Sequence, residues 1–398
     1  MDKETIILAY SGGLDTSVCV RWLQEHHNAK VITLTADLGM VDLESVKSKA
    51  LQIGASEALV IDGRREFVEN FVFPALKAGA IYEERYPLAT ALGRPLIAKY
   101  MTEAAIRFGA TSLAHGCTGK GNDQVRMDVS VGALAPDLKV IAPVREWGWS
   151  RDEEIEYALQ HNIPVEVKKS RFSVDENLWG RSVEAGELED PWEEPPEEAY
   201  AWTRPISSTP DDPVYIEIGF VKGTPTSIDG EDMTAIDLVD HLNFIAGEHG
   251  IGRIDHMENR LVGIKSREVY EAPAGLTLFT AHKSLESLTL SKNQSRMKQL
   301  IAQEYADVVY NGLWYSAHRR DMDAYVESTQ QNVTGSVRVK LYKGNCIVVG
   351  LKSPRALYSR TLATYERGDT FDHRASEGFI SIFGLPIRTE TRKHKEKE

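Results

Sequence analysis

A glycine-containing turn between a strand and a helix constrains the fold of this chain more than any other segment. The apolar run Ile6–Ala9 predicts a short buried strand, and the spacing of apolar residues over 16–23 predicts a helix. Residues 10–17 read Tyr-Ser-Gly-Gly-Leu-Asp-Thr-Ser. Two glycines let a ligand approach the backbone, and a helix N-terminus presents unpaired N–H groups. The segment therefore predicts a phosphate site.

The side chains of this turn are hydroxyl donors and one carboxylate. Ser11, Thr16 and Ser17 carry the hydroxyls, and no lysine follows the glycines, which excludes the GxxxxGK[ST] phosphate loop. Asp15, at the mouth of the turn, suits a Mg²⁺ ligand or a group that orients the loop donors. The alternatives are a helix cap for Asp15 and an ordinary strand-to-helix turn for the whole segment.

Residues 1–165 alternate between predicted strands and helices, which indicates an α/β domain with a parallel sheet. We expect further strands at residues 31–36, 58–62, 112–115 and 140–142, and helices that include 95–108 and 151–161. The turn at 10–17, the turn at 36–39 and the loop after His115 would then meet at the carboxyl ends of the strands. Sheets of this kind bind their ligands at that edge.

The loop after His115 is the second informative segment. It contains three glycines within six residues, at positions 116, 119 and 121. Asn122 and Arg126 are four residues apart, so they share a face if a helix begins there. Arginine suits a carboxylate, and Thr118, Asn122 and Asp123 suit the amine and carboxylate of an amino acid. The alternative is a flexible glycine-rich loop with solvated polar residues.

Composition narrows the function classes. Of 398 residues, 46 are basic and 59 acidic, which gives a net charge of −13 and argues against an extended nucleic-acid surface. No apolar run reaches 18 residues, so we expect no membrane span. The three cysteines, Cys19, Cys117 and Cys346, match no zinc spacing and no disulfide framework. The N-terminus shows no signal-peptide pattern, and we expect a cytoplasmic protein.

The second half of the chain mixes strands and helices without regular alternation, which favours an α+β domain. We expect strands at residues 214–221, 335–341 and 347–351, and helices over 235–248 and 276–310. Residues 190–213 hold six of the 16 prolines and seven acidic residues, so they cannot form a regular helix or a central strand. The predicted organisation is therefore 1–165, 166–360 and a C-terminal arm, 361–398.

The sequence SGGLDTS at residues 11–17 resembles the pyrophosphate loop of the ATP pyrophosphatase family. Members of this family cleave ATP between the α- and β-phosphates, transfer AMP to a substrate oxygen and release pyrophosphate. The resemblance implies an adenine nucleotide α-hydrolase-like fold for residues 1–165. It also implies that ATP binds with Mg²⁺, held through the nucleotide and by Asp15 rather than by a dedicated protein site.

Further stretches resemble the N-type branch of this family that adenylates citrulline and joins it to aspartate. They are residues 115–126, with the pattern HGxTGKGNDQVR, the stretch ERYPLATALGRP at 84–95, SVDENL at 173–178, and segments between 252 and 273. The resemblance covers nearly the whole chain. It implies an ATP-dependent ligase of arginine biosynthesis with a synthetase domain at 166–360.

The resemblance also implies three sets of site residues, with Ser11 and Asp15 handling the pyrophosphate and no general base assigned. The ATP set is Ala9, Tyr10, Ser11, Gly12, Gly13, Leu14, Asp15, Thr16, Ser17, Ala36 and Gly116. The aspartate set is Thr118, Asn122 and Asp123. The citrulline set is Tyr86, Thr90, Asn122, Arg126, Ser173, Ser182, Glu258 and Tyr270. Without the resemblance, Glu258 would be a solvated surface carboxylate and Tyr270 a half-buried strand tyrosine.

Other proteins could carry the same loop. The tRNA-modifying thiolases need a reactive cysteine pair and a basic RNA-binding surface, and neither is apparent in the sequence. Glutamine-dependent amide ligases need a nucleophilic cysteine, for which Cys19, inside the predicted helix, is poorly placed. A non-catalytic, ATP-binding regulator is a further alternative.

The C-terminal arm contains an apolar cluster from Phe379 to Ile387 that is too large for a free tail. Those residues pack either on their own domain or on another subunit. The charged end beyond Arg392 has no apolar face. The resemblance implies a homotetramer in which such arms cross between subunits.

Overall fold

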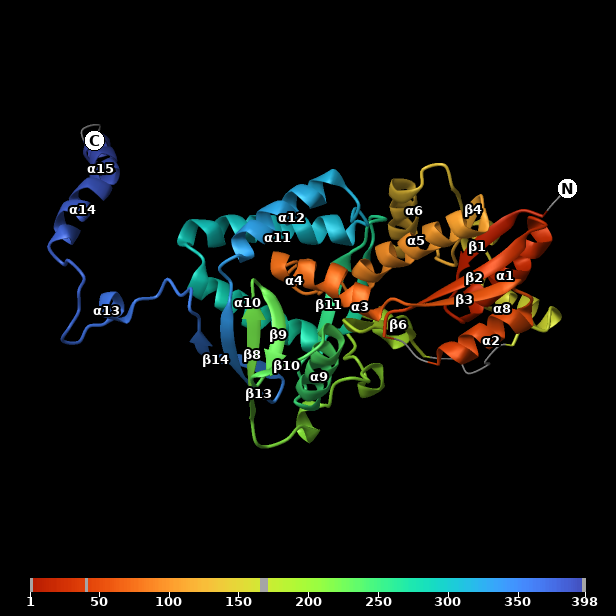
Figure 1. Ribbon diagram of the computed structural model, residues 1–398, viewed down its shortest axis with the longest axis horizontal. Coiled ribbons are helices and arrows are strands. Elements are labelled where there is room, and N and C mark those ends of the chain that lie inside the picture. The colour runs from red at the N-terminus through yellow and green to blue at the C-terminus, as the bar shows by residue number, and fades with distance from the viewer. Residues whose placement is uncertain (1–2, 40–41, 165–170, 396–398) are drawn as a thin grey trace. The chain divides into compact units, whose positions relative to one another are not determined.

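The computed structural model describes residues 3–39, 42–164 and 171–395. The chain divides into two compact units, Met1–Arg355 and Ala356–Glu398 (Figure 1). The boundary expected between residues 165 and 166 lies outside the described residues. The first unit contains three sheets, and the second contains helices.

A five-stranded parallel sheet forms the N-terminal part of the first unit, as the sequence predicted. Its order is β3-β2-β1-β4-β5, with β1 at the centre. The chain moves outward from β1 to β3 on one side and from β4 to β5 on the other. The switch point between β1 and β4 therefore separates the two loops that the sequence singled out. The strands are β1 Thr5–Ala9, β2 Lys30–Asp37, β3 Glu57–Asp62, β4 Ser112–Ala114 and β5 Lys139–Ile141.

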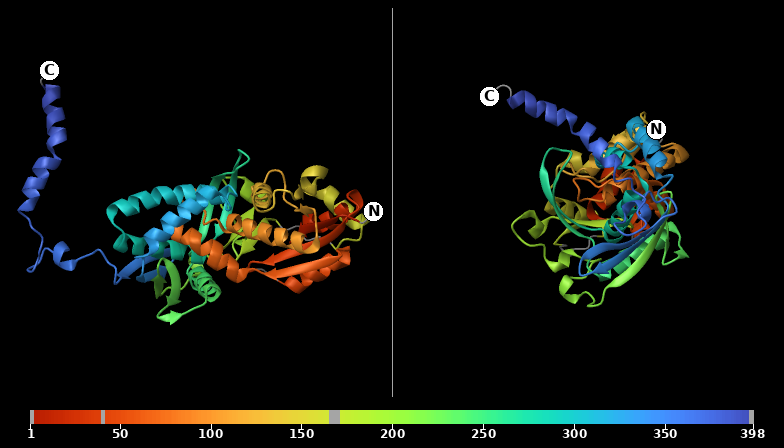
Figure 2. Two further views of the ribbon diagram at one scale, coloured as in Figure 1. Left: turned by 45° about the horizontal axis from the view of Figure 1, so that its top comes forward. Right: turned by 90° about the vertical axis from the view of Figure 1, so that its left-hand side faces the viewer.

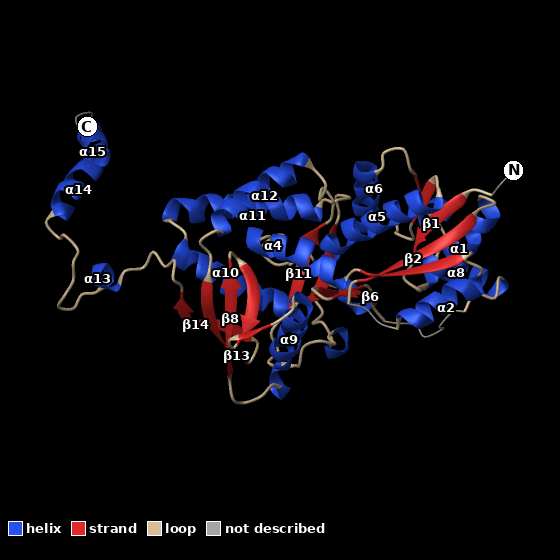
Figure 3. Cartoon of the chain, in the orientation of Figure 1, coloured by secondary structure: helices blue, strands red, loops and turns tan. Residues whose placement is uncertain are grey.

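Helices cover both faces of this sheet (Figure 3). Successive side chains of β1 point to opposite faces of the sheet. Ile7 therefore packs in the core that contains residues of α5, whereas Ile6 and Leu8 pack in the core that contains residues of α1. The helices of this part are α1 Leu14–His26, α2 Leu43–Ile53, α3 Arg64–Phe67, the π-helical turn Val68–Val72, α4 Phe73–Ala78, α5 Ala89–Phe108, α6 Asp123–Leu134, α7 Pro143–Trp147 and α8 Arg151–Gln160.

Helix α5 corrects one sequence expectation, because it begins at Ala89 and not at Pro95. A proline inside a helix removes one backbone hydrogen bond and usually disfavours the turn before it. Here Ala91 and Leu92 in that turn are fully buried in the main core. Tertiary packing therefore offsets the local cost, and the helix continues through the proline.

A four-stranded antiparallel sheet, β11-β12-β7-β6, follows in the structure and was absent from the sequence expectations. Its strands are β6 Ser173–Asn177, β7 Gly180–Glu184, β11 Arg253–Asn259 and β12 Lys265–Glu271. The register pairs Ser182 with both Tyr270 and Asp175, and Glu258 with Ser266. Because alternate residues share a face, these polar side chains lie on one side of the sheet.

A second antiparallel sheet, β10-β9-β8-β13-β14, completes the first unit. It contains β8 Val214–Val221, β9 Thr224–Ile228, β10 Glu231–Asp232, β13 Gly335–Tyr342 and β14 Asn345–Lys352, with the helices α9 Ala235–Glu248, α10 Pro273–Thr289, α11 Lys292–Tyr310 and α12 Ala317–Gln330. The three expected strands and the helix at 235–248 are confirmed. The helical region expected at 276–310 is two helices, because Ser291 caps α11. Residues 190–213 contain only short 3₁₀ turns, as expected.

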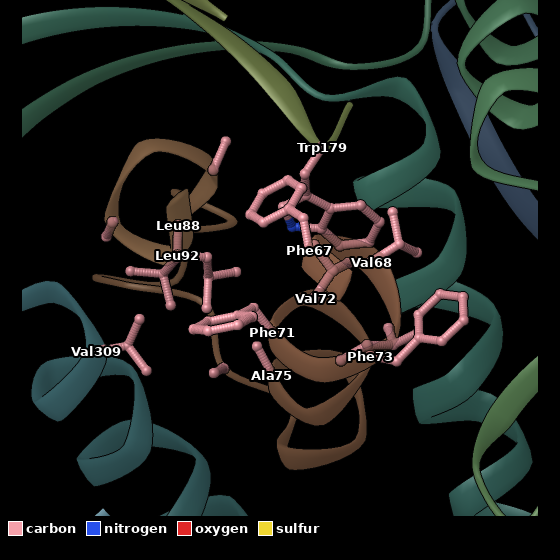
Figure 4. Packing of buried hydrophobic residues seen from close by; sticks show 14 of the residues in the cluster. Phe67, Val68, Phe71, Val72, Phe73, Ala75, Leu88, Leu92, Trp179 and Val309 are labelled. Carbon is pink, nitrogen blue, oxygen red and sulfur yellow. The ribbon is translucent and has the colours of Figure 1, made fainter. Parts of the chain in front are cut away.

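One core joins these parts of the first unit. Figure 4 shows Phe67, Phe71 and Leu92, from the N-terminal part, in the same cluster of buried residues as Trp179 from the turn between β6 and β7. Trp179 is fully buried, and its indole N–H donates to the Pro87 carbonyl at 2.9 Å. The parallel sheet and the antiparallel sheet of β6 and β7 are therefore held together by shared apolar burial.

The second unit contains α13 Arg360–Ala363, α14 Ala375–Phe383 and α15 Leu385–Lys395 (Figure 2). In α14 the rings of Phe379 and Phe383 stack with centroids 5.3 Å apart. None of the helices described in either unit is long and apolar enough to cross a membrane.

Candidate functional site

A cleft of about 690 Å³ opens at the carboxyl ends of the parallel strands. The loops after β1, β2 and β4 form one wall, and the polar face of the β11-β12-β7-β6 sheet forms the other. All but two of the residues predicted for the site line this cleft, and the two exceptions are Gly12 and Ser17. The predicted residues that line it are Ala9, Tyr10, Ser11, Gly13, Leu14, Asp15, Thr16, Ala36, Tyr86, Thr90, Gly116, Thr118, Asn122, Asp123, Arg126, Ser173, Ser182, Glu258 and Tyr270.

The turn after β1 is shaped by its own hydroxyls and glycines. The Ser11 hydroxyl accepts the Gly13 N–H at 3.3 Å and lies 3.1 Å from the Thr16 hydroxyl. Gly12 has φ +81°, a conformation that favours glycine, and a Cβ at this position would lie 3.2 Å from the Val46 side chain. Both observations explain why the turn has glycine here. Ser17 is buried and lies 3.1 Å from the Tyr10 phenol, so it also braces the turn.

Helix α1 presents an uncapped N-terminus to the cleft. Its N-cap is Gly13, which has no side chain to cap the helix. The N–H groups of the first turn are thus available to an anion. Asp15 lies within the first turn of α1 and is not its N-cap. The alternative that Asp15 serves only as the N-cap of this helix is therefore wrong.

Asp15 forms an ion pair with the first residue of α8. The Arg151 guanidinium lies 2.6 Å from one Asp15 oxygen and 3.5 Å from Glu154. Burial raises the pKa of Glu154 to about 8, and the nearby charge of Asp15 acts in the same direction. The mouth of the turn therefore carries two carboxyl groups that share one arginine.

The loop after β4 is held in place by hydrogen bonds. Gln124 donates to the carbonyl oxygens of Gly119 and Gly121 at 2.5 and 3.2 Å. Asn122 is the N-cap residue of α6, donates to the Tyr310 hydroxyl at 2.7 Å and accepts the Leu261 N–H at 2.9 Å. The loop is thus anchored to Leu261 and Tyr310, far along the sequence. It is not the flexible glycine-rich loop that the sequence left open as an alternative.

Arg126 is buried and offers one nitrogen to a ligand. Its Nε donates to the Tyr310 carbonyl and its Nη1 to Asp123, both at 2.9 Å. Nη2 is buried and has no hydrogen-bond partner among the described residues. A buried guanidinium nitrogen without a partner is costly, so a carboxylate in the cleft would stabilise it.

Arg94 joins three elements at the floor of the cleft. Its guanidinium, on α5, donates to Asp123 at 2.9 Å and pairs with Asp175 on β6. Burial acts to raise the pKa of Asp123, but the charges of Arg94 and Arg126 outweigh it and hold that pKa below its usual value. For Asp175, burial prevails over Arg94, and the pKa is raised.

The wall formed by the sheet β11-β12-β7-β6, here called the distal wall, carries a buried carboxylate between aromatic rings. Glu258 is 3% exposed and accepts hydrogen bonds from the Tyr270 and Tyr310 hydroxyls. The rings of Tyr86 and Tyr270 stack with centroids 4.2 Å apart, and the Tyr86 hydroxyl accepts the Thr90 N–H at 2.9 Å. Burial raises the pKa of Tyr270 well above its ordinary value, so its phenol stays protonated as a donor. Glu258 is thus a buried cleft residue and not a surface carboxylate.

The edge of this wall is acidic. Ser173 is exposed at the start of β6, and the Ser182 hydroxyl donates to the Asp175 carbonyl at 3.2 Å. Glu184 and Glu268 share the guanidinium of Arg260. Burial, followed by the charge of Glu184, raises the pKa of Glu268 to about 8.

Sequence reasoning missed several residues of the cleft. Arg94 and Asp175 lie within stretches already noted for their pattern, and the alternation Ser266-x-Glu268-x-Tyr270 could have indicated a polar strand face. Tyr310, which contacts Asn122, Arg126 and Glu258, carries no local signal, because its partners lie 52 to 188 positions away. The residues missed include Arg94, Arg151, Asp175, Glu184, Arg260, Glu268 and Tyr310.

The segment from His115 to Cys117 makes close contacts that shape the loop after β4. A Cβ at Gly116 would lie 2.9 Å from the Thr16 methyl group, so this position keeps the two loops close together. His115 is buried and lies 2.7 Å from Asp128. Burial raises the pKa of the Cys117 thiol to about 12, which leaves it unreactive near neutral pH.

Among residues 3–39, 42–164 and 171–395, no group of three or more His, Cys, Asp or Glu side chains is placed to hold a metal ion. Asp15 is the carboxylate of the turn at residues 10–17 that lines the cleft. This donor set fits a Mg²⁺ ion held chiefly by phosphate oxygens and water, with at most one protein ligand.

Comparison with known proteins covers almost the whole chain. Residues 5–164 match the model of the arginosuccinate synthase N-terminal HUP domain, and residues 172–390 match that of the arginosuccinate synthase C-terminal domain. The chain is 57% identical over 391 residues to an argininosuccinate synthase of Trichodesmium erythraeum, covering 98% of each chain. It is 55% identical over 398 residues to that of Bacillus pumilus, covering 100% of this chain and 98% of the relative. With that of Dehalococcoides mccartyi it shares 54% identity over 390 residues, 98% of this chain and 96% of the relative.

Proposed function

Because this chain belongs to the argininosuccinate synthase family, we propose that its cleft binds ATP, citrulline and aspartate side by side. The protein is an ATP-dependent ligase that joins citrulline and aspartate in arginine biosynthesis. One observation supports the shared cleft: residues expected for the three substrates come from segments far apart in the sequence and line the same cavity.

ATP occupies the edge of the parallel sheet. The α1 N-terminus and the Ser11 and Thr16 hydroxyls donate to the β- and γ-phosphates, and Ala9, Ala36 and Gly116 line the space toward the nucleoside. Mg²⁺ would be held by the phosphate oxygens and Asp15, and it would neutralise charge on the pyrophosphate as it departs. Gly12 and Ser17 belong to the same predicted ATP set, and both also support the conformation of the turn.

Citrulline occupies the distal wall. The unpaired Nη2 of Arg126 binds its carboxylate, and Glu258 with the hydroxyl-bearing side chains around it binds its ammonium. Ser173, Ser182, Tyr86 and Thr90 complete this wall. Thr118, Asn122 and Asp123 hold aspartate at the loop after β4, between citrulline and the nucleotide.

The reaction proceeds in two displacements. The ureido oxygen of citrulline attacks the α-phosphorus of ATP, and pyrophosphate leaves with the electron pair of the broken bond. The aspartate amine then attacks the ureido carbon, AMP leaves with the oxygen, and the nitrogen loses a proton. Activation is needed because a ureido oxygen is a poor leaving group, and the cleft contributes orientation and charge stabilisation.

Release of pyrophosphate by the full chain tests this proposal. With ATP and Mg²⁺, we expect pyrophosphate and AMP to form in equal amounts only when both citrulline and aspartate are present, together with argininosuccinate. Omission of either amino acid serves as the control. Release that depends on glutamine or on tRNA would contradict the proposal and favour another enzyme with the same loop.

The assembly and location of the enzyme belong to the same proposal. Residues 1–165 would form the ATP-binding domain, 166–360 the synthetase domain and 361–398 the oligomerisation arm. Both of the first two parts supply contacts to the amino acids, for example Arg126 and Glu258. The side chains from Phe379 to Ile387 are exposed in this chain, which supports a homotetramer held by the arm. The absence of disulfides among Cys19, Cys117 and Cys346 supports a cytoplasmic location.

A further inference from the structure

The departing pyrophosphate is the most highly charged group that the cleft holds, and the turn around it offers mainly neutral donors. Ser11 and Thr16 contribute hydroxyls, and the first turn of α1, which begins after Gly13, contributes backbone N–H groups. Asp15 adds a negative charge. Transition-state charge of this size is usually met by positioned cations as well as by hydrogen bonds. A basic side chain at this end of the cleft would therefore serve the reaction.

Two basic side chains approach the turn. Lys49 donates to the Gly12 carbonyl at 2.6 Å. Arg151 lines the cleft, and its Nη1 lies 2.6 Å from Asp15 and 3.5 Å from Glu154. In the part of the chain that the structure describes, the Nε and Nη2 atoms of Arg151 have no hydrogen-bond partner, and its side chain is 63% exposed. It can bind an anion while it keeps its contact with Asp15.

The backbone position of Arg151 is fixed relative to the turn. Arg151 is the first residue of α8, and Ser150 closes a capping box with Glu153 immediately before it. Helix α8 packs on α1 through a buried cluster that contains Val18 and Ala158. The helix that carries the arginine is therefore docked on the helix that carries the phosphate turn.

We propose that Arg151 binds the β- and γ-phosphate oxygens of ATP and then the departing pyrophosphate, with Asp15 and Glu154 positioning its guanidinium. The assignment rests on the proposed function and adds to it a residue outside the ATP set predicted from the sequence. A planar guanidinium suits two phosphate oxygens at once. It would supply the positive charge that the lysine of a GxxxxGK[ST] loop supplies elsewhere.

Calorimetric titration of the full chain tests the assignment with two probes, inorganic pyrophosphate with Mg²⁺ and AMP. We expect Arg151→Gln to weaken pyrophosphate binding about 10- to 100-fold, the range for one charged hydrogen-bonding group. AMP binding should stay unchanged, because AMP has no β- or γ-phosphate. Arg151→Lys keeps the charge without the planar fork, and its loss should be smaller. Arg65→Gln removes another exposed arginine and its pair with Glu69, and it is the matched control.

Two results would overturn the assignment. One is pyrophosphate binding by Arg151→Gln that equals that of the unmodified chain. The other is an equal loss of AMP and pyrophosphate binding in both Arg151 variants, which would assign the residue a purely structural role. Failure of the unmodified chain to bind pyrophosphate at all would instead contradict the proposed function. A thermal unfolding curve for each variant identifies any loss that comes from misfolding.

Discussion

At the residue scale, several polar side chains of the cleft are paired with one another. Asp15 pairs with Arg151, Arg126 with Asp123, and Glu258 accepts from two tyrosines. Each of these groups is held in a defined position, so little reorganisation is needed when the substrates arrive. Their substitution should therefore change binding or turnover more than it changes the fold.

Asp15→Asn should reduce turnover by more than about tenfold at limiting Mg²⁺, because a loss of 1.4 kcal/mol in charge stabilisation has that effect. The free energy of unfolding should change by less than about 1 kcal/mol, since the ion pair with Arg151 is largely exposed. Initial rates of pyrophosphate release over a Mg²⁺ series measure the effect. Asp62→Asn, which removes an exposed pair with Arg64, is the control. Unchanged rates at every Mg²⁺ concentration would rule out a role through the metal.

Arg126→Lys should weaken citrulline binding by about 1.5–3 kcal/mol, the range for a charged hydrogen bond. A lysine keeps the charge, but it cannot contact Asp123, the Tyr310 carbonyl and a ligand carboxylate as the guanidinium does. ATP binding should remain almost intact. Titration of each amino acid in the presence of ATP measures the change. An equal loss of ATP affinity would mean that the residue serves the nucleotide or the fold.

Glu268→Gln should remove part of the pH dependence of stability. The pKa of Glu268 is about 8 in the folded chain and near 4.5 when it is exposed, so between these values the unfolded state loses a proton that the folded state keeps. The free energy of unfolding contributed by Glu268 therefore falls as pH rises through this window. Burial is the main cause of the raised pKa of Glu268, the charges of Glu184 and Glu258 add to it, and Arg260 opposes it.

Denaturant unfolding at pH 5 and pH 8 measures this effect, and the variant should lose less stability between the two than the unmodified chain. Glu217→Gln, at an exposed position on β8, should leave the pH dependence as it is. A variant with the same dependence as the unmodified chain would show that Glu268 ionises normally.

At the scale of elements, the sequence predicted the strongly apolar strands and missed the polar strands of the sheet β11-β12-β7-β6. The strands β1, β2 and β8 carry strong apolar patterns, and their positions were correct within one or two residues. By contrast, β6 reads Ser-Val-Asp-Glu-Asn and β12 reads Lys-Ser-Arg-Glu-Val-Tyr-Glu. Because the face of these strands that lines the cleft is polar, the strands lack the alternation of apolar and polar residues that predicts a half-buried strand.

The residues of the candidate site were likewise predicted in part. Short motifs predicted the residues of the two loops, since a turn and the helix after it are contiguous in sequence. Arg151 and Tyr310 reach the site only through the packing of α8 and α11, which no local pattern encodes. Family resemblance supplied Glu258 and Tyr270, whose residue types alone favoured ordinary structural roles.

Helix α8 offers a test of how an element positions a functional side chain. Ser150→Ala should lower the free energy of unfolding by about 1 kcal/mol through loss of the cap, and it should also weaken pyrophosphate binding because Arg151 is the next residue. Ser291→Ala removes the same capping box from α11 and should cost similar stability without a change in pyrophosphate binding. Equal binding losses in the two variants would mean that general destabilisation, and not the position of Arg151, is responsible.

At the scale of the whole molecule, the chain places its chemistry in the first unit and a set of exposed apolar side chains in the second. In α14 and α15, Phe379, Ile382, Phe383 and Ile387 are between 64% and 75% exposed. Side chains of this size usually pack in a protein interior or an interface. Their exposure in a single chain supports the proposal that another subunit covers them.

Truncation of the arm separates the apolar cluster from the charged end. A chain that ends at Thr391 should keep its oligomeric state in light scattering, because the residues removed form only weak exposed pairs. A chain that ends at Glu377 should dissociate or precipitate, since each large apolar side chain contributes about 1.5–3 kcal/mol when buried. An unchanged, well-behaved assembly from the shorter chain would place the cluster outside the subunit interface. Residues 396–398 of the charged end lie outside the described residues.

The central claim is that one cleft brings the ureido oxygen of citrulline to the α-phosphate of ATP. Citrulline labelled with ¹⁸O at the ureido oxygen, supplied with ATP, Mg²⁺ and aspartate, tests it through the mass of the AMP product. We expect AMP that carries one ¹⁸O atom per turnover, because the oxygen that attacks phosphorus leaves with AMP. Unlabelled AMP with the label retained in the amino-acid product or released to water would contradict it.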